Sequence, residues 1–518
     1  MNPKILAAGA FALLIAAPAC TDLTEVPQSA ITPENFYRNE DEVIGGLASV
    51  YAQLRSTNDD YYNLSEITTD EMIVPTRGSD WYDNGLWLDI HRQTFGANSP
   101  AGLGAINGAW VNLFQGVARA NVVLAGIENV SFASKPTVTA ELRTLRAWYY
   151  FLLMDFFGGV PIVTDPSIQA RPQNTRQEVF NFVESELKAA RADLPAKWSA
   201  DMNGRVTQGT VDAMLASLYL NATVFNGTVS AAGLQFGAAR WQDAINAANA
   251  VINSGNYTLA TDANQGCSTA GCGWRKNFTG DNNTSPEIIF AIKYVPVSGL
   301  GLNFLMRALH YSQFTPSPWN GFATLADTYA AFDPVDQRTQ IFLAGRQYNV
   351  LTGQPVNDRQ GNPLYFDPAI PDVTAATEGA GVRITKWPAD PNHLQQDNGN
   401  DYAYFRLGEM YLIRAEAENE LGQTAAAVAD INLVRARVFN PPKPIAPATQ
   451  QAVRDAILQE RLFELTAEGK RRQDLIRFNR FTQGAWYAKT SNAPYKVLMP
   501  IPQPQIDANP QLQQNPGY

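Results

Sequence analysis

The chain has 518 residues, of which 45% are hydrophobic and 11% aromatic, a composition typical of a packed globular protein and not of a disordered one. At this length we expect two subdomains, or one helical body with a large insert. The formal net charge is −10 and the sequence has no basic block. This argues against a nucleic-acid partner, and against adsorption to anionic lipid by charge alone.

The N-terminus has the layout of a secretory signal. Lys4 is followed by an apolar run over residues 5–17, too short to span a bilayer comfortably, and small residues precede Cys20. Because the run ends at a cysteine, it resembles a bacterial lipoprotein signal. This resemblance predicts removal of residues 1–19, lipidation of Cys20 and attachment to a membrane by acyl chains. The residues just before the cysteine depart from the usual pattern, so ordinary secretion with a free Cys20 is the alternative.

Amphipathic periodicity predicts a helical body. Apolar residues recur at spacings of three and four over 109–124, and residues 141–157 repeat the pattern up to the glycines at 158 and 159. The outer positions of this second helix are also apolar, which predicts burial on more than one face. Two pairs of helical segments resemble one repeated tetratricopeptide-type hairpin with small alanines at the facing positions: 209–223 with 240–255, and 407–421 with 424–434.

The character of the sequence changes between residues 258 and 400. Gly, Pro, Asn and Asp are frequent there, the clearest strand is 287–294, and helical periodicity is confined to the region 324–332. Loops this long inside a globular chain are usually functional. The tail, residues 500–518, is rich in Pro and Gln, so we expect it to be extended and not helical.

Two cysteines remain besides Cys20. Cys267 and Cys272 stand in the stretch GCSTAGC, and in an exported chain this spacing predicts a small disulfide-closed loop, with free thiols as the alternative. A metal site is not expected here, since two more ligands would be needed and no histidine is near.

The sequence shows no recognisable catalytic machinery. The three histidines are far apart, and there is no nucleophile elbow, Walker loop or Rossmann loop. Glu460, Glu464 and Glu468 are spaced by four on one predicted helix near several arginines, which favours structural pairs such as Glu468–Arg472 over catalysis. The stretch GDNNTSPE, residues 280–287, lacks the spacing of a calcium loop, and we expect a solvated turn. No metal or cofactor is expected.

Large aromatic side chains gather in two polar, loop-like stretches, SDWYDNGLW (79–87) and HYSQFTPSPWNGF (310–322). Two interpretations are open. The rings could fold back and fill a core edge. Alternatively, they could stack on the C–H face of a sugar while neighbouring Asp, Asn and Arg side chains bind its hydroxyls. The candidate ligand-binding residues are Arg77, Trp81, Tyr82, Asp83, Asn84, Trp87, Tyr311, Phe314, Trp319 and Asn320.

The C-terminal third resembles the SusD/RagB family of outer-membrane nutrient-binding lipoproteins. The matching motifs are, in order, FRLGEMYLIRAEAENELG, INLVRARVFNPP, ILQERLFELTAEGKRRQDLIRF and LMPIPQPQIDANPQLQQNPGY. The resemblance continues upstream in ELRTLRAWYYFLLMDFFGGVP, GRVTQGTVDAMLASLYLNA and RWQDAINAANAVINSGNY. No single motif is specific, but the combination covers nearly the whole mature chain.

The resemblance implies a mainly α fold: a helical scaffold of tetratricopeptide-like helix pairs with a loop-rich ligand-binding region and a few short strands. Within one unit over residues 20–518 we expect three parts. These are an N-terminal helical part (20–258) with the first aromatic loop (76–100), a loop-rich insert of the binding face (259–400), and a C-terminal helical part with the tail (401–518).

The family function implied is non-catalytic. The protein would bind an oligosaccharide or other nutrient at the cell surface and deliver it to a TonB-dependent SusC-like transporter, while the lipid on Cys20 holds it to the outer membrane. A peptide-binding lid of the transporter is one alternative. From the enzyme class, a secreted glycoside hydrolase is another.

Overall fold

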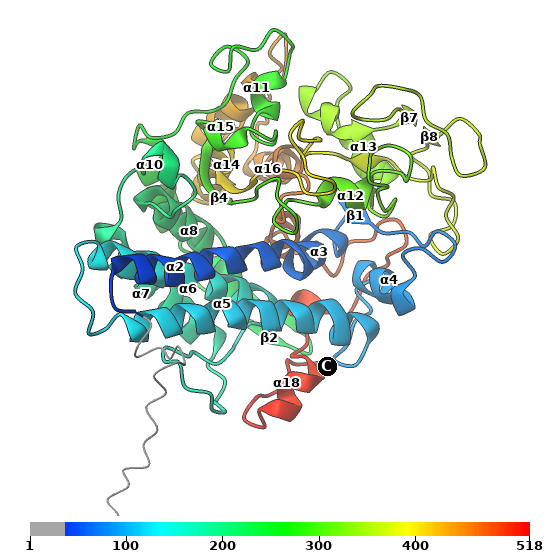
Figure 1. Cartoon of the computed structure of the whole chain (residues 1–518). Coiled ribbons are helices and arrows are strands. Elements are labelled where there is room, and N and C mark those ends of the chain that lie inside the picture. The colour runs from blue at the N-terminus through cyan, green and yellow to red at the C-terminus, as the bar shows by residue number, and fades with distance from the viewer. Residues whose placement is uncertain (1–36) are drawn as a thin grey trace, which may run out of the picture.

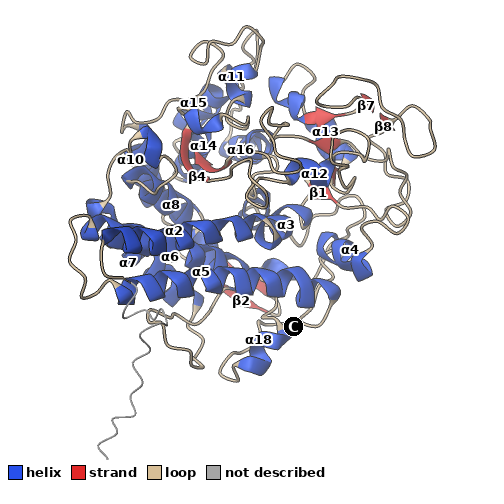
Figure 2. Cartoon of the chain, in the orientation of Figure 1, coloured by secondary structure: helices blue, strands red, loops and turns tan. Residues whose placement is uncertain are grey.

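The structure is a computed structural model that describes residues 37–518, and its body is helical (Figures 1 and 2). This confirms the predicted mainly α fold class. The longer helices are α2 (Glu40–Gln53), α3 (Asp60–Ile67), α5 (Asn107–Gly126), α6 (Lys135–Phe157), α7 (Arg176–Ala190), α8 (Gln208–Leu220), α10 (Trp241–Ile252), α14 (Leu407–Glu420), α15 (Thr424–Ala436) and α16 (Gln450–Leu465). Shorter ones are α4 (Leu86–His91), α9 (Ala222–Phe225), α11 (Cys272–Arg275), α12 (Phe304–Ala308), α13 (Ala326–Ala331), α17 (Arg471–Arg477) and α18 (Gln503–Ala508).

The strands are short and form antiparallel pairs (Figure 2). The pairs are β1 (Met72–Ile73) with β5 (Ala323–Thr324), β2 (Thr228–Ser230) with β3 (Gly233–Gln235), β4 (Ile288–Ile292) with β10 (Tyr402–Arg406), β6 (Phe342–Leu343) with β9 (Arg383–Ile384), and β7 (Gly345–Arg346) with β8 (Tyr365–Phe366). Two of these pairs position the candidate site. The β1–β5 pair joins the first aromatic stretch to the second, and β10 runs directly from the insert into α14.

The predicted helix pairs are present and stack on one another. Helix α8 packs on α10 and α14 packs on α15, while α10 also packs on α14, so the two pairs form one continuous layer. On its other side, α8 packs on α7, and α5, α6 and α7 follow in sequence. Gly116 allows the close approach of α5 and α6, because a Cβ there would lie 2.4 Å from the Tyr149 ring. As predicted, α6 is buried nearly all round.

The tail differs from the prediction. Residues 503–508 form α18 and are not extended. Pro502 precedes this helix and Pro504 lies in its first turn, where the missing N–H has no intrahelical partner to lose. Proline content therefore did not exclude a short helix.

Buried ion pairs fasten the insert to the C-terminal helices. Arg406, at the start of α14, contacts Glu287 (3.0 Å), Glu468 (2.7 Å) and Glu464. Glu464 of α16 also binds Arg338 of the insert at 3.1 Å. All five side chains are at most 1% exposed. Burial alone would raise the pKa of Glu464, but the neighbouring guanidinium groups outweigh burial and hold its pKa well below the usual range.

This cluster confirms that the glutamates of the predicted helix are structural, with two corrections. Glu468 lies beyond the end of α16, in a turn where Ala467 and Gly469 have φ angles of 63° and 72°. Consequently Glu468 pairs with Lys386 and Arg406, and Arg472 instead pairs with Asp155 at 3.1 Å.

The stretch at residues 280–287 is only partly the solvated turn that the sequence predicted. The Asn282 side chain is buried and donates to the carbonyl oxygen of Asp401 at 2.8 Å, and Glu287 is buried in the ion cluster. Within residues 37–518, no group of acidic, histidine or cysteine side chains has the arrangement of a metal site.

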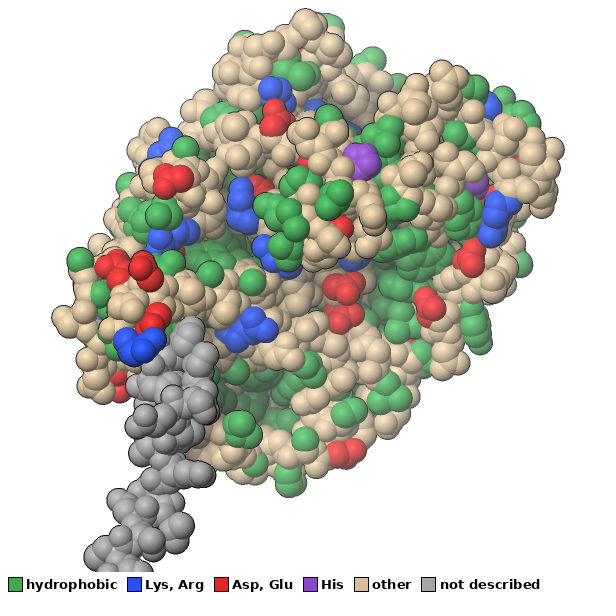
Figure 3. Space-filling view, in the orientation of Figure 1, with side chains coloured by type: hydrophobic (Ala, Val, Ile, Leu, Met, Phe, Trp, Pro, Cys, Tyr) green, Lys and Arg blue, Asp and Glu red, His purple; other side chains and the backbone are tan. Residues whose placement is uncertain are grey.

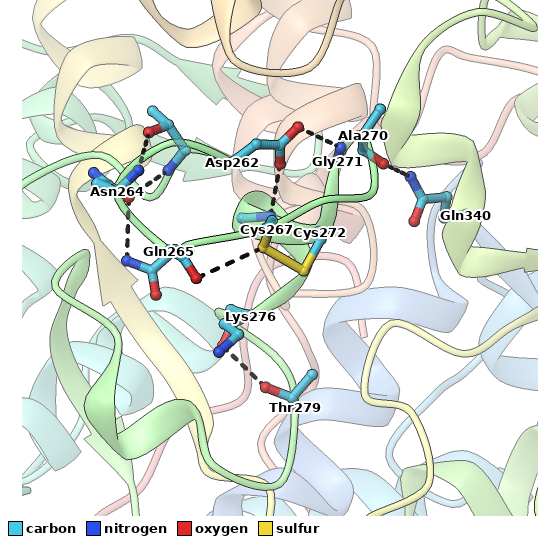
Figure 4. The surroundings of a disulfide bond; sticks show 12 residues. Asp262, Asn264, Gln265, Cys267, Ala270, Gly271, Cys272, Lys276, Thr279 and Gln340 are labelled. Carbon is cyan, nitrogen blue, oxygen red and sulfur yellow. Dashed lines mark hydrogen bonds between the residues drawn. A yellow bond between two sulfur atoms is a disulfide. The ribbon is translucent and has the colours of Figure 1, made fainter.

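Figure 4 shows a disulfide between Cys267 and Cys272, whose Cα atoms are 5.8 Å apart. The Asp262 carboxylate closes the same loop by accepting from the backbone N–H groups of Gly271 (2.9 Å) and Gly273 (2.8 Å). The loop leads into α11, where the buried Trp274 donates from Nε1 to Glu464 at 3.1 Å. The bonded loop is thereby connected to the ion cluster.

The predicted signal peptide and Cys20 lie outside the described residues. Over residues 37–518, none of the helices combines the length and apolar character needed to cross a bilayer.

Candidate ligand-binding site

The first aromatic stretch is a strained loop between β1 and α4. Trp81, Asp83 and Asn84 have left-handed backbone φ angles of 61°, 38° and 55°. Aspartate and asparagine adopt this region more readily than other residues with a side chain, so Trp81 is the strained position, and strained residues cluster at ligand-binding and active sites. A backbone bridge between Arg77 and Asp80 closes the base of the loop, with N···O distances of 2.9 and 3.1 Å.

Three rings hold this loop against the second aromatic stretch. Trp81 meets Trp87 and Phe322 edge to face at centroid distances of 5.3 and 5.5 Å, and Trp87 meets Phe322 at 5.6 Å. The Trp81 indole Nε1 donates to the carbonyl oxygen of Trp319 at 2.6 Å. The two stretches, more than 200 residues apart in the chain, therefore form one aromatic corner.

Gly321 sets the position of the Trp81 ring, because a Cβ there would lie 2.3 Å from it. We expect Gly321→Ala to displace Trp81 and to destabilise the fold by about 1–3 kcal/mol, the usual cost of overpacking. Near-UV circular dichroism and chemical denaturation would measure the two effects. The matched control is Gly45→Ala in α2, where a Cβ meets no atom within 4 Å and alanine is neutral or stabilising. Unchanged aromatic dichroism in Gly321→Ala would contradict the packing described.

An open pocket of about 460 Å³ lies beside the aromatic corner. Its lining residues come from both stretches: Ser79, Asp80, Trp81, Asp83, Tyr311, Pro318 and Trp319. Trp81, Tyr311 and Trp319 are all half-buried, so part of each ring remains accessible. In the space-filling view, hydrophobic side chains gather on the side where α4 and the loop-rich region meet (Figure 3). The pocket thus combines aromatic surface with carboxylate oxygens.

A group of charged side chains adjoins one edge of the pocket through Asp80 and Tyr311. The Tyr311 hydroxyl donates to the Asp80 carboxylate, and the Arg359 guanidinium lies 4.3 Å from the centre of the Tyr311 ring and 3.6 Å from Asp80. Arg359 also donates to Glu378, which accepts a hydrogen bond from His310 at 2.9 Å. Burial acts to raise the pKa of Glu378, but the Arg359 and His310 hydrogen bonds prevail and lower it to about 2.

Two family models match the chain. The model of the SusD family matches residues 276–518, and one described as "Starch-binding associating with outer membrane" matches residues 37–220. The chain belongs to the SusD/RagB family. The resemblance noted in the C-terminal motifs is confirmed.

Curated relatives of this family member cover almost its whole length. SusD-like protein P25 of Formosa agariphila is 24% identical, with 96% of each chain covered. The starch-binding protein SusD of Bacteroides thetaiotaomicron is 26% identical, with 88% of this chain and 85% of the relative covered.

Solved structures show the same fold. A laminarin-binding SusD-like protein matches with a TM-score of 0.72 at 23% identity, covering 93% of this chain and 100% of its own. Surface glycan-binding protein A from Bacteroides thetaiotaomicron matches with a TM-score of 0.73 at 20% identity, covering 93% of this chain and 100% of its own. These likenesses show that the overall fold is shared.

In this SusD/RagB family member, four of the candidate residues line the pocket: Trp81, Asp83, Tyr311 and Trp319. Trp87 lies behind them, packing on Trp81 and donating from Nε1 to the Asp83 carboxylate at 2.5 Å. Tyr82 and Asn84 are exposed but lie outside the lining.

Three other candidates are buried and support the site from below. Arg77 donates to the carbonyl oxygens of Asn320 and Ala380, both at 2.9 Å, and is 2% exposed. The buried Asn320 accepts from Arg383 at 2.8 Å. Phe314 belongs to a small core cluster and is 3% exposed. Arg77 and Asn320 use their polar groups in buried hydrogen bonds, and Phe314 packs in the core. We therefore leave these three residues out of the ligand-binding set.

Sequence reasoning missed the charged edge. Arg359 and Glu378 come from the long loops of the insert, where neither lies in an aromatic stretch or a motif. Only folding brings Arg359 to Tyr311, 48 positions earlier in the chain. The local signal in this segment is a tyrosine among Gly, Asn and Pro residues, as at Tyr348 and Tyr365.

Proposed function

We propose that this protein is a non-catalytic binding protein for a neutral oligosaccharide, which it captures at the cell surface and passes to a SusC-like TonB-dependent transporter. The observation that carries the proposal is the pocket in which the rings of Trp81, Tyr311 and Trp319 lie beside Asp80 and Asp83. Aromatic rings offer a flat apolar surface to the C–H face of a sugar, and carboxylates accept hydrogen bonds from its hydroxyls.

The charge of the pocket favours a neutral ligand. Asp80 and Asp83 are the charged residues that line it, and the nearby Arg359 is already engaged by Asp80 and Glu378. A uronate or sulfate group would therefore meet carboxylates without a free cation opposite them, at separations where charges interact appreciably. Two similar proteins, one starch-binding and one laminarin-binding, are named for neutral glycans, which supports the same choice.

The pocket carboxylates hold rings in place, which supports binding over hydrolysis. Asp80 accepts from the Tyr311 hydroxyl and Asp83 accepts from the Trp87 indole. A glycoside hydrolase instead needs two carboxyl groups that face each other across the scissile bond. The same contacts preorganise the rings, which lowers the entropic cost of capturing a ligand.

The proposed location is the outer membrane. A family model whose description names association with this membrane matches residues 37–220. Lipid on Cys20 would supply the anchor, and release of the ligand to a transporter requires no chemistry at the pocket.

Affinity electrophoresis and calorimetry with a panel of polysaccharides test the proposal, with starch and laminarin as neutral members and polygalacturonate as an anionic one. We expect retention by a neutral glycan and no release of reducing ends on prolonged incubation. Sustained release of reducing ends would favour the hydrolase alternative. Binding of peptides without binding of any glycan would favour the peptide lid.

Binding is expected to vary little with pH. The folded pKa of Glu378 is lowered to about 2 from 4.5, so its ion pair is complete above about pH 5 and is lost as the pH falls towards 2. The pKa of Tyr311 is raised to about 12, chiefly by burial and then by its bond to Asp80, so its hydroxyl stays a donor. Calorimetry should show less than about a threefold change in Kd between about pH 5 and 9. A steep change near neutrality would contradict this arrangement.

A further inference from the structure

A second open pocket of about 450 Å³ lies on the other side of Arg359. We call the pocket beside the aromatic corner the first lobe and this one the second lobe. Its lining includes Arg359, Gln360, Tyr365, Thr377 and Glu378. Like the first lobe it combines an aromatic ring with polar side chains, and Gln360, Tyr365 and Thr377 are exposed.

Arg359 joins the two lobes. Its guanidinium lies over the ring of Tyr311 and near Asp80, both of which line the first lobe, while Arg359 itself lines the second. Glu378 of the second lobe holds the guanidinium in this position. The lobes therefore meet at the Arg359 side chain and at the loop of residues 77–80, in which Gly78 lines the second lobe and Ser79 the first.

A built hairpin presents Tyr365 to the second lobe. Strands β7 and β8 form its base, and Leu364 and Phe366 on either side of Tyr365 are buried in a small core cluster. Alternation along the strand then directs Tyr365 outward, and it is 58% exposed. The Arg346 guanidinium lies 5.7 Å from the centre of the Tyr365 ring, which stiffens it.

Glycine at position 379 brings this hairpin close to the site. A Cβ on Gly379 would lie 2.2 Å from the carbonyl oxygen of Tyr365, so any larger residue would push the strand away. The close approach places the exposed ring at the rim of the second lobe.

We infer that the second lobe is a further glycan subsite, with Tyr365 as its stacking residue, and that the ligand is an oligosaccharide long enough to contact Trp319 and Tyr365 at once. The inference rests on the proposed function, because it extends the same site. It predicts that affinity rises with chain length until both lobes are filled. A disaccharide occupies only the first lobe, which has more aromatic surface.

The test measures binding of malto- and laminari-oligosaccharides, from disaccharide to heptasaccharide, to the full protein and its variants. We expect Tyr365→Ala to weaken heptasaccharide binding about tenfold and to leave disaccharide binding unchanged. Tyr365→Phe, which keeps the ring, should bind the heptasaccharide like the wild type. The matched control is Tyr348→Ala, because Tyr348 lies on the same hairpin, is 49% exposed and is absent from both linings.

The possible outcomes distinguish failure of the second subsite from failure of the proposed function. A Tyr365→Ala variant that binds every length like the wild type would overturn the second subsite and leave the proposed function intact. Equal weakening at all lengths would also overturn it, since Tyr365 would then belong to a single site. A wild-type protein that binds neither these oligosaccharides nor any glycan of the panel would overturn the proposed function and this inference together.

Discussion

Trp319→Ala is expected to weaken binding of the glycan by about thirtyfold, or about 2 kcal/mol, the loss typical of a central aromatic contact. The ring lines the pocket, whereas the hydrogen bond that Trp319 provides to Trp81 comes from its backbone carbonyl and survives the substitution. The variant therefore removes stacking surface without releasing the aromatic corner. Calorimetry with the glycan found in the panel measures the effect.

Stability must be followed in parallel, because half-buried tryptophans also pack. The matched control is Trp241→Ala at the start of α10, a half-buried tryptophan that lies outside the pocket lining. We expect Trp241→Ala to lower the melting temperature and to leave the Kd unchanged. Trp81→Ala should reduce both affinity and stability, since Trp81 also packs on Phe322. Wild-type affinity in Trp319→Ala would show that the rings serve only packing.

Arg406→Met is expected to be the most destabilising single change outside the site, costing about 3–5 kcal/mol in the free energy of unfolding. Arg406 is fully buried and faces Glu287, Glu464 and Glu468. Removing it leaves these carboxylates with fewer cations in a medium of low polarity. Chemical denaturation measures the loss.

The pH dependence of the variant gives a second readout. Without Arg406, burial would raise the pKa of the carboxylates that lose its charge, so the folded state would bind protons more readily than the unfolded chain. The stability of Arg406→Met should therefore fall further below that of the wild type as pH rises from about 5 to 8. The control is Arg480→Ala, which removes an exposed pair with Asp455 (3.0 Å; side chains 56% and 50% exposed) and should cost at most about 1 kcal/mol. Equal losses in the two variants would contradict the role given to the buried cluster.

The cluster matters for function because it ties the insert to the scaffold. Arg338 and Lys386 belong to the insert; Arg338 binds Glu464 near the end of α16, and Lys386 binds Glu468 just after it. These ion pairs thereby hold the insert, which carries part of the pocket, against the helical scaffold. Variants of the cluster should lower glycan affinity only to the extent that they unfold the protein.

Local pattern in the sequence was sufficient for the scaffold. The spacing of apolar residues placed α5, α8, α10, α14 and α15 within a few residues of their observed bounds, because a helix that packs on a core must repeat its buried face every three to four positions. For α6 it placed the C-terminal end, but the helix begins at Lys135 and not at residue 141. The paired cysteines and the clustered aromatic residues were likewise visible, since each signal lies within a short stretch of chain.

Tertiary structure alone decided which aromatic and polar residues face the pocket. Trp81 and Phe314 stand in similar sequence surroundings, yet one lines the pocket and the other is 3% exposed. From the sequence, Asn320 and Arg77 were candidates to bind sugar hydroxyls, but both instead make hydrogen bonds to buried protein groups. The orientation of a side chain in a loop depends on contacts with distant segments, such as that between Arg359 and Tyr311. Such contacts leave no periodic pattern in the sequence. The sequence by itself therefore determined the helical frame and the family, and the packing of distant loops decided the site.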